Sequence, residues 1–320
     1  MAMVAFTGCG GGDEKGSPAA GGASGATKLT VAYLPSVQFA PLFLADKLGY
    51  YEDAGLDVEL KRVTQGTTLV PSLLKGEVQG SVTSWGALGL SKAAGLPLVG
   101  TNTFDIAPTD TTRDAVQFAV LKSSATKRLE DLDGKTIGVN ATKNFAELSV
   151  IEALRKSGSK AKYVAIPFPN MGAALKAGTV DAIVLTEPFL SQLGDEAPIR
   201  ELGGGNTEYM PGLPITAFMM TKEFIAKNEA TARAFMEATD KATAYAAEHP
   251  DAVRDVFPAV AGVSADVAQK AKLPQYAEAI DVAKLDEQSR LMKENGFAKE
   301  ATDMGAVVAD IAAAKVTGGR

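Results

Sequence analysis

The feature that most constrains this chain is a half-unit that occurs twice along it. Residues 76–82 match residues 178–184 at an offset of 102, and both segments follow a short helical pattern that contains Leu and Lys. Thr30-Val31 matches Thr136-Ile137 at an offset of 106. Any two β/α units look partly alike, but two nearly equal offsets favour a duplicated unit.

Short β-branched runs alternate with helical patterns in both copies. Strands are expected at 29–34, 58–60, 78–82 and 98–102, and again at 135–139, 163–166 and 180–185. Helices are expected at 40–48, 69–75, 84–94, 144–157 and 171–177. This alternation is typical of βαβ units and predicts an α/β fold with mostly parallel sheets flanked by helices.

The last third of the chain is predicted to be helical, after one more strand at 217–220. Apolar spacing near 3.6 residues covers 223–227, 230–248, 250–256, 264–270, 282–295 and 302–315. We therefore expect two lobes with a cleft between them. Residues 28–118 with 217–320 would form lobe I, and residues 119–216 would form lobe II. Segments 115–121 and 216–221 are expected to cross between the lobes as a hinge.

The composition excludes several classes of site. The 320-residue chain has a net charge of −6 and no basic block with interleaved aromatic residues, which argues against nucleic-acid binding. Its single cysteine, Cys9, cannot form an internal disulfide, and its single histidine, His249, excludes a metal site built on histidines. A Ser-His-Asp triad would need His249, which lies in a run typical of a helix junction. No apolar run reaches the roughly 18 residues that a membrane span needs. We expect no catalytic residue, metal or cofactor.

The N-terminal segment, residues 1–27, is predicted to contain a targeting signal remnant followed by a flexible linker. Phe6-Thr-Gly-Cys9 resembles the lipobox of bacterial lipoproteins, in which the cysteine is acylated. Of the eighteen residues from Gly10 to Thr27, thirteen are Gly, Ala or Ser, which predicts a flexible linker. Only eight residues precede Cys9 and none is Lys or Arg, so either the true start lies upstream or Cys9 is an incidental cysteine. We favour a lipid anchor that holds the folded part outside the cytoplasmic membrane.

The candidate ligand site follows from the ends of the predicted strands. In open α/β sheets, ligands bind beyond the carboxyl ends of strands, at the point where the strand order reverses. The candidates in lobe I are Ser36, Gln38, Phe39, Ser84, Trp85, Asn102 and Phe104. Those in lobe II are Asn140, Asn144, Phe145, Thr186 and Glu187. The repeat places the pair Ser84-Trp85 opposite Thr186-Glu187 across the cleft.

Each candidate also has a purely structural alternative. Ser36, Ser84 and Asn144 could be plain helix N-caps, and an aromatic residue at a strand end could belong to the core of its lobe. Glu187 could be a first-turn residue that favours its own helix dipole. Trp85 is the strongest candidate for stacking on a flat ligand, because it is the only tryptophan and directly follows a strand.

Five segments in the same order resemble the solute-binding proteins for nitrate, sulfonates, taurine and thiamine precursors. The first begins Phe39-Ala-Pro-Leu-Phe-Leu-Ala-Asp-Lys-Leu-Gly-Tyr-Tyr and continues to Glu59. The others are 73–78, 129–139, 174–189 and 248–253. The resemblance covers about Lys28 to Val256 and is specific in combination.

This resemblance implies a periplasmic-binding-protein fold of type II, whose two lobes close on a small solute. It further implies a closed form that docks on an ABC permease with a separate ATPase. The chain has no Gly-x-x-x-x-Gly-Lys-Ser/Thr loop of its own. We expect a monomeric, extracytoplasmic binding protein without enzymatic activity. A sensor that presents its ligand to a membrane receptor stays open as an alternative.

The solute is less constrained than the fold. Aromatic and acidic candidates favour a flat aromatic or pyrimidine-like solute, with Glu187 and Asp105 accepting hydrogen bonds from its amines. The alternative is an alkanesulfonate, a taurine-like compound or another small anion, held by helix N-termini and by Lys143 or Arg113. An enzyme of the fungal pyrimidine-synthase type is a further alternative. It would need a histidine near its cofactor and a cysteine-rich motif, and the sequence lacks both.

Overall fold

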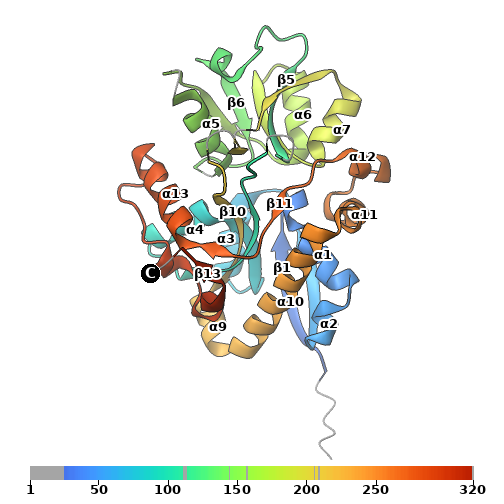
Figure 1. Ribbon diagram of the computed structural model, residues 1–320, viewed down its shortest axis with the longest axis vertical. Helices are drawn as coiled ribbons and strands as arrows, with labels where there is room; N and C mark the ends of the chain where they lie inside the picture. Colours follow the sequence, from blue (N-terminus) through green and yellow to red (C-terminus); the bar gives the residue numbers. More distant parts are fainter. Residues whose placement is uncertain are drawn as a thin grey trace, which may run out of the picture.

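Two β-sheets organise the protein, one in each lobe (Figure 1). The computed structural model describes residues 25–110, 114–143, 145–155, 158–204, 206–207 and 210–318. Lobe I contains a six-stranded sheet of order β11-β4-β10-β3-β1-β2, and lobe II contains a five-stranded sheet of order β7-β6-β8-β5-β9. The predicted two-lobed α/β architecture is therefore confirmed.

The strands lie close to where the sequence predicts them. Lobe I contains β1 (Thr27–Tyr33), β2 (Leu56–Arg62), β3 (Gly80–Ser84), β4 (Leu98–Ile106), β10 (Pro214–Thr221) and β11 (Gln275–Tyr276). Lobe II contains β5 (Val116–Leu121), β6 (Thr136–Val139), β7 (Lys162–Ala165), β8 (Ala182–Thr186) and β9 (Ile199–Gly203). The two short strands β12 (Ile280–Asp281) and β13 (Val316–Thr317) pair separately.

Helices cover the sheets and extend lobe I. Lobe II carries α5 (Phe145–Arg155), α6 (Phe168–Lys176) and α7 (Phe189–Glu196), preceded by the 3-10 turn Leu129–Leu132. Lobe I begins with α1 (Ala40–Lys47), α2 (Tyr50–Asp53), α3 (Leu69–Leu74) and α4 (Trp85–Ala93), and with the 3-10 turns Val37–Phe39 and Gly66–Thr68. Its C-terminal part adds α9 (Lys222–Lys227), α10 (Glu229–Glu248), α11 (Pro250–Ala261), α12 (Ala265–Lys270) and α13 (Val282–Glu294). None of the helices in the described ranges combines the length and the apolar character needed to cross a bilayer.

The two sheets share one arrangement of strands, as the sequence repeat predicts. The order β2-β1-β3-β10-β4 in lobe I corresponds to β7-β6-β8-β5-β9 in lobe II. In each lobe one strand pairs in parallel with two others, β1 with β2 and β3, and β6 with β7 and β8. The inserted strands β10 and β5 run antiparallel to both of their neighbours. Each sheet is therefore mixed.

The chain passes between the lobes through two connections, which span 107–115 and 204–213. They are joined to each other, because Ala107 N donates to Leu213 O and Gly212 N donates to Ala107 O, both at 2.8 Å. The segments expected to cross, 115–121 and 216–221, instead lie within β5 and β10, where the sheets satisfy their backbone groups. The expected lobe boundaries after residues 118 and 216 thus fall inside strands.

Alternation along the strands gives lobe II a core on each face of its sheet. Phe118 and Val120 of β5 pack with Ile137 and Val184 on the α5 side. Ala119 packs on the other face, with side chains of α6 and α7. This is the period of two expected of a strand buried on both sides. Lobe I instead has one large core that unites its sheet with the C-terminal helices, and a smaller cluster packs Met292 of α13 with Leu148 of α5 between the lobes.

The C-terminal segment departs from its predicted helix at 302–315. It forms the 3-10 turns Gly305–Val307 and Asp310–Lys315, with Val308 between them. Val308 makes an isolated parallel bridge with Gly100 of β4, and Ala309 N donates to Gly100 O at 2.9 Å. An α-helix cannot form across these residues, because their backbone groups pair with the sheet edge.

A third link between the lobes is a segment of lobe I, residues 261–272, which we call the strap. It includes α12, which lies beside α7 in Figure 1. Ala261 packs into the core between α6 and α7. Lys270 Nζ lies 2.8 Å from both carboxylate oxygens of Asp195, and Lys272 Nζ lies 2.5 Å from Glu201 Oε2. The strap therefore fastens lobe I to the outer side of lobe II.

Candidate functional site

A cavity of about 170 Å³ lies where the two sheets face each other. Its polar lining consists of Ser36, Gln38, Thr83, Ser84, Asn140, Thr186, Asn206 and Thr216. Its apolar lining consists of Leu34, Phe39, Leu69, Ala87, Val116, Ala141, Ala146, Phe168, Val184 and Ile215, with Gly66. No charged side chain is among these residues. The volume is below the roughly 300–1,000 Å³ of pockets for drug-sized ligands, so the cavity suits a small solute.

Residues of the two lobes touch each other beside this cavity. Thr186 Oγ1 of lobe II donates to Gln38 Oε1 of lobe I at 3.2 Å, and Ser36 Oγ lies 3.4 Å from Thr186 Oγ1. Ser36 Oγ also donates to Gln38 Oε1. Val37 N donates to Glu187 O at 3.1 Å. The loop after β1 and the end of β8 therefore close one side of the cavity.

Six of the predicted site residues line the cavity: Ser36, Gln38, Phe39, Ser84, Asn140 and Thr186. Ser84 is an N-cap as well, because its Oγ accepts from Ala87 N at 3.2 Å. Its two possible roles are compatible, since the capped end of α4 borders the cavity. The rule that ligands bind at strand ends thus brings residues of both lobes to one place.

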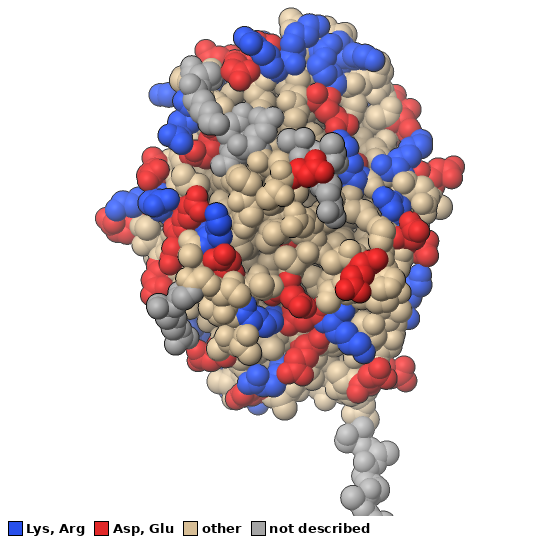
Figure 2. Space-filling view, viewed as in Figure 1, with Lys and Arg blue, Asp and Glu red and all other residues tan. Residues whose placement is uncertain are grey.

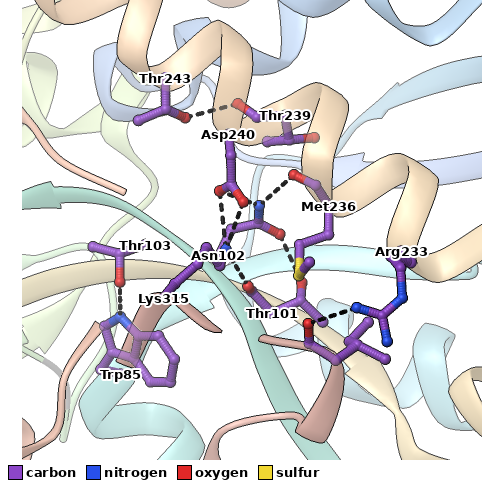
Figure 3. Close-up of polar contacts among 11 residues, drawn as sticks. Trp85, Thr101, Asn102, Thr103, Arg233, Met236, Thr239, Asp240, Thr243 and Lys315 are labelled. Atoms are coloured by element: carbon purple, nitrogen blue, oxygen red, sulfur yellow. Dashed lines mark hydrogen bonds and ion pairs between the residues drawn. The ribbon is translucent and has the colours of Figure 1, made fainter. Parts of the chain in front are cut away.

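Trp85 lies in the core of lobe I, which corrects its prediction as a stacking residue (Figure 3). Its side chain is fully buried, and Nε1 donates to Thr103 Oγ1 at 3.1 Å. A Cβ at Gly100 would lie 2.5 Å from two of the ring carbons. The indole ring therefore packs on the bare backbone of β4, and this fit holds it away from the cavity.

Asn102 is also corrected, because it binds a helix of its own lobe (Figure 3). Its Nδ2 donates to Met236 O at 3.0 Å and to Asp240 Oδ1 at 2.7 Å, both on α10. Lys315 Nζ lies 2.7 Å from Asp240 Oδ2 in the same cluster. Burial raises the pKa of Asp240, and Lys315 opposes that rise. Asn102 thus joins α10, and through Asp240 the C-terminal segment, to β4.

Phe104 does not reach the cavity either. Its fully buried ring packs edge-on against Phe39, with 5.5 Å between the ring centroids and 85° between their planes. Since Phe39 borders the cavity, Phe104 lies behind the wall and supports it.

The Glu187 carboxylate is held by the protein itself, so it is not free to bind a ligand. The residue is 2% exposed. Glu187 Oε2 accepts from Ser191 N at 3.0 Å, and Oε1 accepts from Ser191 Oγ at 3.0 Å and from Lys272 N at 3.2 Å. Burial raises the pKa of Glu187, and these hydrogen bonds counter part of the rise. Glu187 therefore joins the strap to lobe II.

Five other predicted residues are not placed at the cavity, one of which, Cys9, was predicted as a lipidation site. Cys9, Arg113 and Asn144 lie outside the described residues, and so does the side chain of Phe145. Lys143, the other expected anion partner, is exposed and does not line the cavity.

The sequence of the segment that contains the cavity residues decides the family. Residues 36–253 match the family described as NMT1/THI5 like. The chain belongs to the NMT1/THI5-like family. The matched range contains both connections and every described cavity residue except Leu34.

Relatives of this NMT1/THI5-like protein agree with the family assignment. YtlA of Bacillus subtilis (strain 168), which is named as a binding protein, is 26% identical over 254 residues, covering 72% of this chain and 71% of its own. The ligand-binding component of an ABC-type import system from Staphylococcus aureus, solved with zinc bound, gives a TM-score of 0.79 at 17% identity, covering 92% of this chain and 100% of its own. The resemblance to solute-binding proteins is thus confirmed.

The same fold occurs with different functions in other solved structures. The alkanesulfonate-binding protein SsuA from Xanthomonas axonopodis pv. citri, bound to MOPS, gives a TM-score of 0.75 at 18% identity, covering 90% of this chain and 99% of its own. The desulfurization enzyme DSZB gives a TM-score of 0.64 at 17% identity, covering 90% of this chain and 98% of its own. The fold alone therefore does not decide what an NMT1/THI5-like protein does.

Several cavity residues were missed by the sequence interpretation. Gly66 and Leu69 follow β2, and Phe168 follows β7, so the strand-end rule already contained the signal for them. Asn206 and Thr216 lie at the returning connection and at the start of β10. Their position depends on how the two connections run together, which no local pattern reveals.

Two buried aspartates lie next to these missed residues. Asp105 Oδ1 accepts from Thr216 N at 3.2 Å and also from Thr216 Oγ1. Burial raises the pKa of Asp105 to about 7, against the effect of these hydrogen bonds. Asp114 accepts from Thr207 N at 3.2 Å, from Thr207 Oγ1 at 3.0 Å and from Val116 N at 3.1 Å, and burial raises its pKa too. Both carboxylates organise the connections from behind the cavity wall.

The outer surface around the lobe junction complements this uncharged lining. Figure 2 shows a tan area near the centre of this face, with acidic and basic side chains on the surface around it. Within the described residues, no group of three or more His, Cys, Asp or Glu side chains could hold a metal ion.

Proposed function

We propose that this protein is the extracytoplasmic substrate-binding component of an ABC import system. It captures a small organic solute between its lobes by hinge closure and delivers it to a membrane permease driven by a separate ATPase. The observation that carries this proposal is the small cavity at the facing strand ends of two duplicated lobes, lined from both sides. The protein would act as a monomer, anchored to the membrane through an acylated Cys9.

An aromatic or pyrimidine-like solute fits the proposed site best. Phe39 and Phe168 border the cavity, and so do Gln38, Asn140 and Asn206. Aromatic faces with a few convergent polar groups are typical of sites for flat, hydrogen-bonding ligands. An alkanesulfonate or taurine-like anion is the alternative, which the likeness to SsuA favours.

A role without catalysis is supported by the position of the only histidine. His249 stacks on Tyr245 at the exposed junction of α10 and α11, with 3.8 Å between the ring centroids. It does not line the cavity. The described lining has no Asp, Glu, Lys, His or Cys that could act as an acid, a base or a nucleophile.

The test is to find the solute and then block its site. Native mass spectrometry of the purified protein should detect one small molecule bound per chain, released with unchanged mass. A free ligand at 100 times its Kd should raise the free energy of unfolding by about 2.7 kcal/mol. Ala141→Trp, which fills the cavity, should abolish both effects. Ala125→Trp, at an exposed position of the same lobe, should leave them intact. Binding that survives Ala141→Trp, or turnover of the bound compound, would refute the proposal.

A further inference from the structure

We infer that the cavity selects an uncharged solute that donates hydrogen bonds to Asn206 and Thr216. This inference rests on the proposed function and adds the chemical class of the ligand. The pattern of donors and acceptors already used up inside the protein determines what the cavity still offers to a ligand.

Asn206 borders the cavity and carries a buried amide oxygen without a hydrogen-bond partner among the described residues. The residue is 1% exposed and borders the cavity. Its Nδ2 donates to Asp114 Oδ1 at 3.3 Å, and its Oδ1 has no hydrogen-bond partner within the described part of the chain. Flipping the amide would place Oδ1 against the Asp114 carboxylate, so the orientation is fixed. A buried acceptor without a partner calls for a donor from the ligand.

Thr216 presents a second acceptor. Its backbone N–H and its hydroxyl group both donate to Asp105 Oδ1 behind the wall. The hydroxyl has only one proton, so toward the cavity Thr216 Oγ1 offers lone pairs alone. Asn206 and Thr216 would therefore each accept a hydrogen bond from an N–H or O–H group of the ligand.

Gln38 supplies the complementary donor from the loop after β1. Its Oε1 accepts from Ser36 Oγ and from Thr186 Oγ1, so the amide oxygen is occupied and Nε2 remains to donate. The described lining also contains no charged side chain. Within the described lining, an oxyanion would place its oxygen atoms against two acceptors without a countercharge. A primary carboxamide, a sulfonamide or an amino-substituted ring nitrogen heterocycle satisfies all three groups.

The test uses pairs of probes that have nearly the same shape and differ in charge and in donor groups. We would compare methanesulfonamide with methanesulfonate, benzamide with benzoate, and nicotinamide with nicotinate, by calorimetry on the full chain. At least one uncharged member should bind about tenfold or more tightly than its anionic partner. If only the anions bind, this inference falls and the proposed function stands. If no member of either class binds but native mass spectrometry detects another bound solute, this inference falls and the proposed function stands. If no bound solute is found by either method, both fail.

Two substitutions then separate the cavity acceptor from the support of the connection. Asn206→Leu removes Oδ1 at similar volume and should weaken binding of the preferred probe about tenfold or more. Thr207→Val is the matched control, because it also removes a donor to Asp114 but does not border the cavity. Because Thr207 does not border the cavity, this substitution should change the affinity for the probe by less than about threefold.

A thermal unfolding midpoint checks that Asn206→Leu is folded. If it is not, Thr216→Val removes the second acceptor and should produce the same selective loss of affinity for the uncharged probe. Unchanged affinity in a folded Asn206→Leu or Thr216→Val protein would overturn the inference.

Discussion

The equivalent ends of β3 and β8 show how two copies of one unit came to differ. Ser84 and Thr186 occupy matching positions, and both line the cavity. The next residues, Trp85 and Glu187, both turn into the protein, but with different roles. Trp85 fills the core of lobe I, whereas Glu187 binds the strap that reaches lobe II from outside. The position that lines the cavity, Ser84 or Thr186, is thus alike in the two copies, whereas the next position, Trp85 or Glu187, differs in its role.

The lobes also differ in what stabilises them. Lobe I has one large core, and the pair Asp240–Lys315 fastens its last residues to β4 and α10. The Lys315 and Asp240 side chains are only 16% and 13% exposed. Lobe II has two smaller cores on either side of a five-stranded sheet. We infer that lobe II depends on contacts from lobe I, such as the strap, more than lobe I depends on it.

The largest effect is expected from Trp85→Ala. Removing a fully buried indole should lower the free energy of unfolding by about 3–5 kcal/mol, because the ring packs against Gly100 and no neighbour can fill the space. Urea denaturation followed by far-UV circular dichroism measures this change. Solute affinity of the folded fraction should stay the same. An unchanged stability with lost binding would instead place the ring in the cavity, and the contrast with Glu187 would disappear.

The second effect concerns the pH dependence of lobe I. Burial raises the pKa of Asp105 from 3.8 to about 7, so the folded protein keeps a proton that the unfolded chain releases near pH 4. The contribution of Asp105 to stability is therefore complete below pH 4 and is lost as the pH rises through about 7. Urea midpoints measured between pH 4 and 8 should fall less steeply in Asp105→Asn than in the unaltered protein.

Two other titratable groups near Asp105, Asp114 and Tyr276, also affect how stability depends on pH. Repulsion by Asp114 adds to the effect of burial on the pKa of Asp105. Burial also raises the pKa of Tyr276, and repulsion by Asp105 adds to that rise. Asp114 itself has a raised pKa and remains in the variant, so the difference between the two curves isolates Asp105. Parallel curves would show that the pKa of Asp105 is the same in the folded and unfolded states.

The smallest effect tests the strap. Glu187→Ala leaves Ser191 N and Lys272 N without their acceptor and should cost about 1–3 kcal/mol. Hydrogen exchange should show faster exchange in α7 and the strap, with β1 and β4 unaffected. Lys272→Met is the control, because it keeps the Lys272 N donor to Glu187 and removes the partly exposed pair with Glu201, together with a minor charge effect on Glu187; it should cost about 0–1 kcal/mol. Equal losses in the two variants would mean that the carboxylate does not hold the strap.

The sequence predicts the architecture well, because the repeat, the strand patterns and the capping residues are local signals. It also identifies Ser36, Ser84 and Thr186, which follow directly from the strand-end rule. It fails for Trp85, because whether a side chain at a helix start faces the ligand or the core depends on space opposite it. Here the space is created by Gly100, fifteen residues further along the chain.

Asn206 marks the other limit of prediction from sequence. Its importance comes from an acceptor that is left unpaired after Asp114 has taken the amide nitrogen. Asp114 is distant in sequence and meets Asn206 only because the two connections run together. The helix predicted for the C-terminal segment is wrong for a similar reason, since Val308 forms a parallel bridge with Gly100 of β4.

The hydrogen-bonded pairing of the two connections has a consequence for how such proteins diversify. The backbone of Ala107 forms hydrogen bonds with both Gly212 and Leu213, so the chain passes from lobe I into lobe II and back at adjacent points. It is an insertion with adjacent ends. A recombination event could exchange the whole of it while the sheet and the long helices of lobe I stay as they are. Half of the binding wall would then change in one step, and new specificities could arise by swapping modules instead of by successive point mutations.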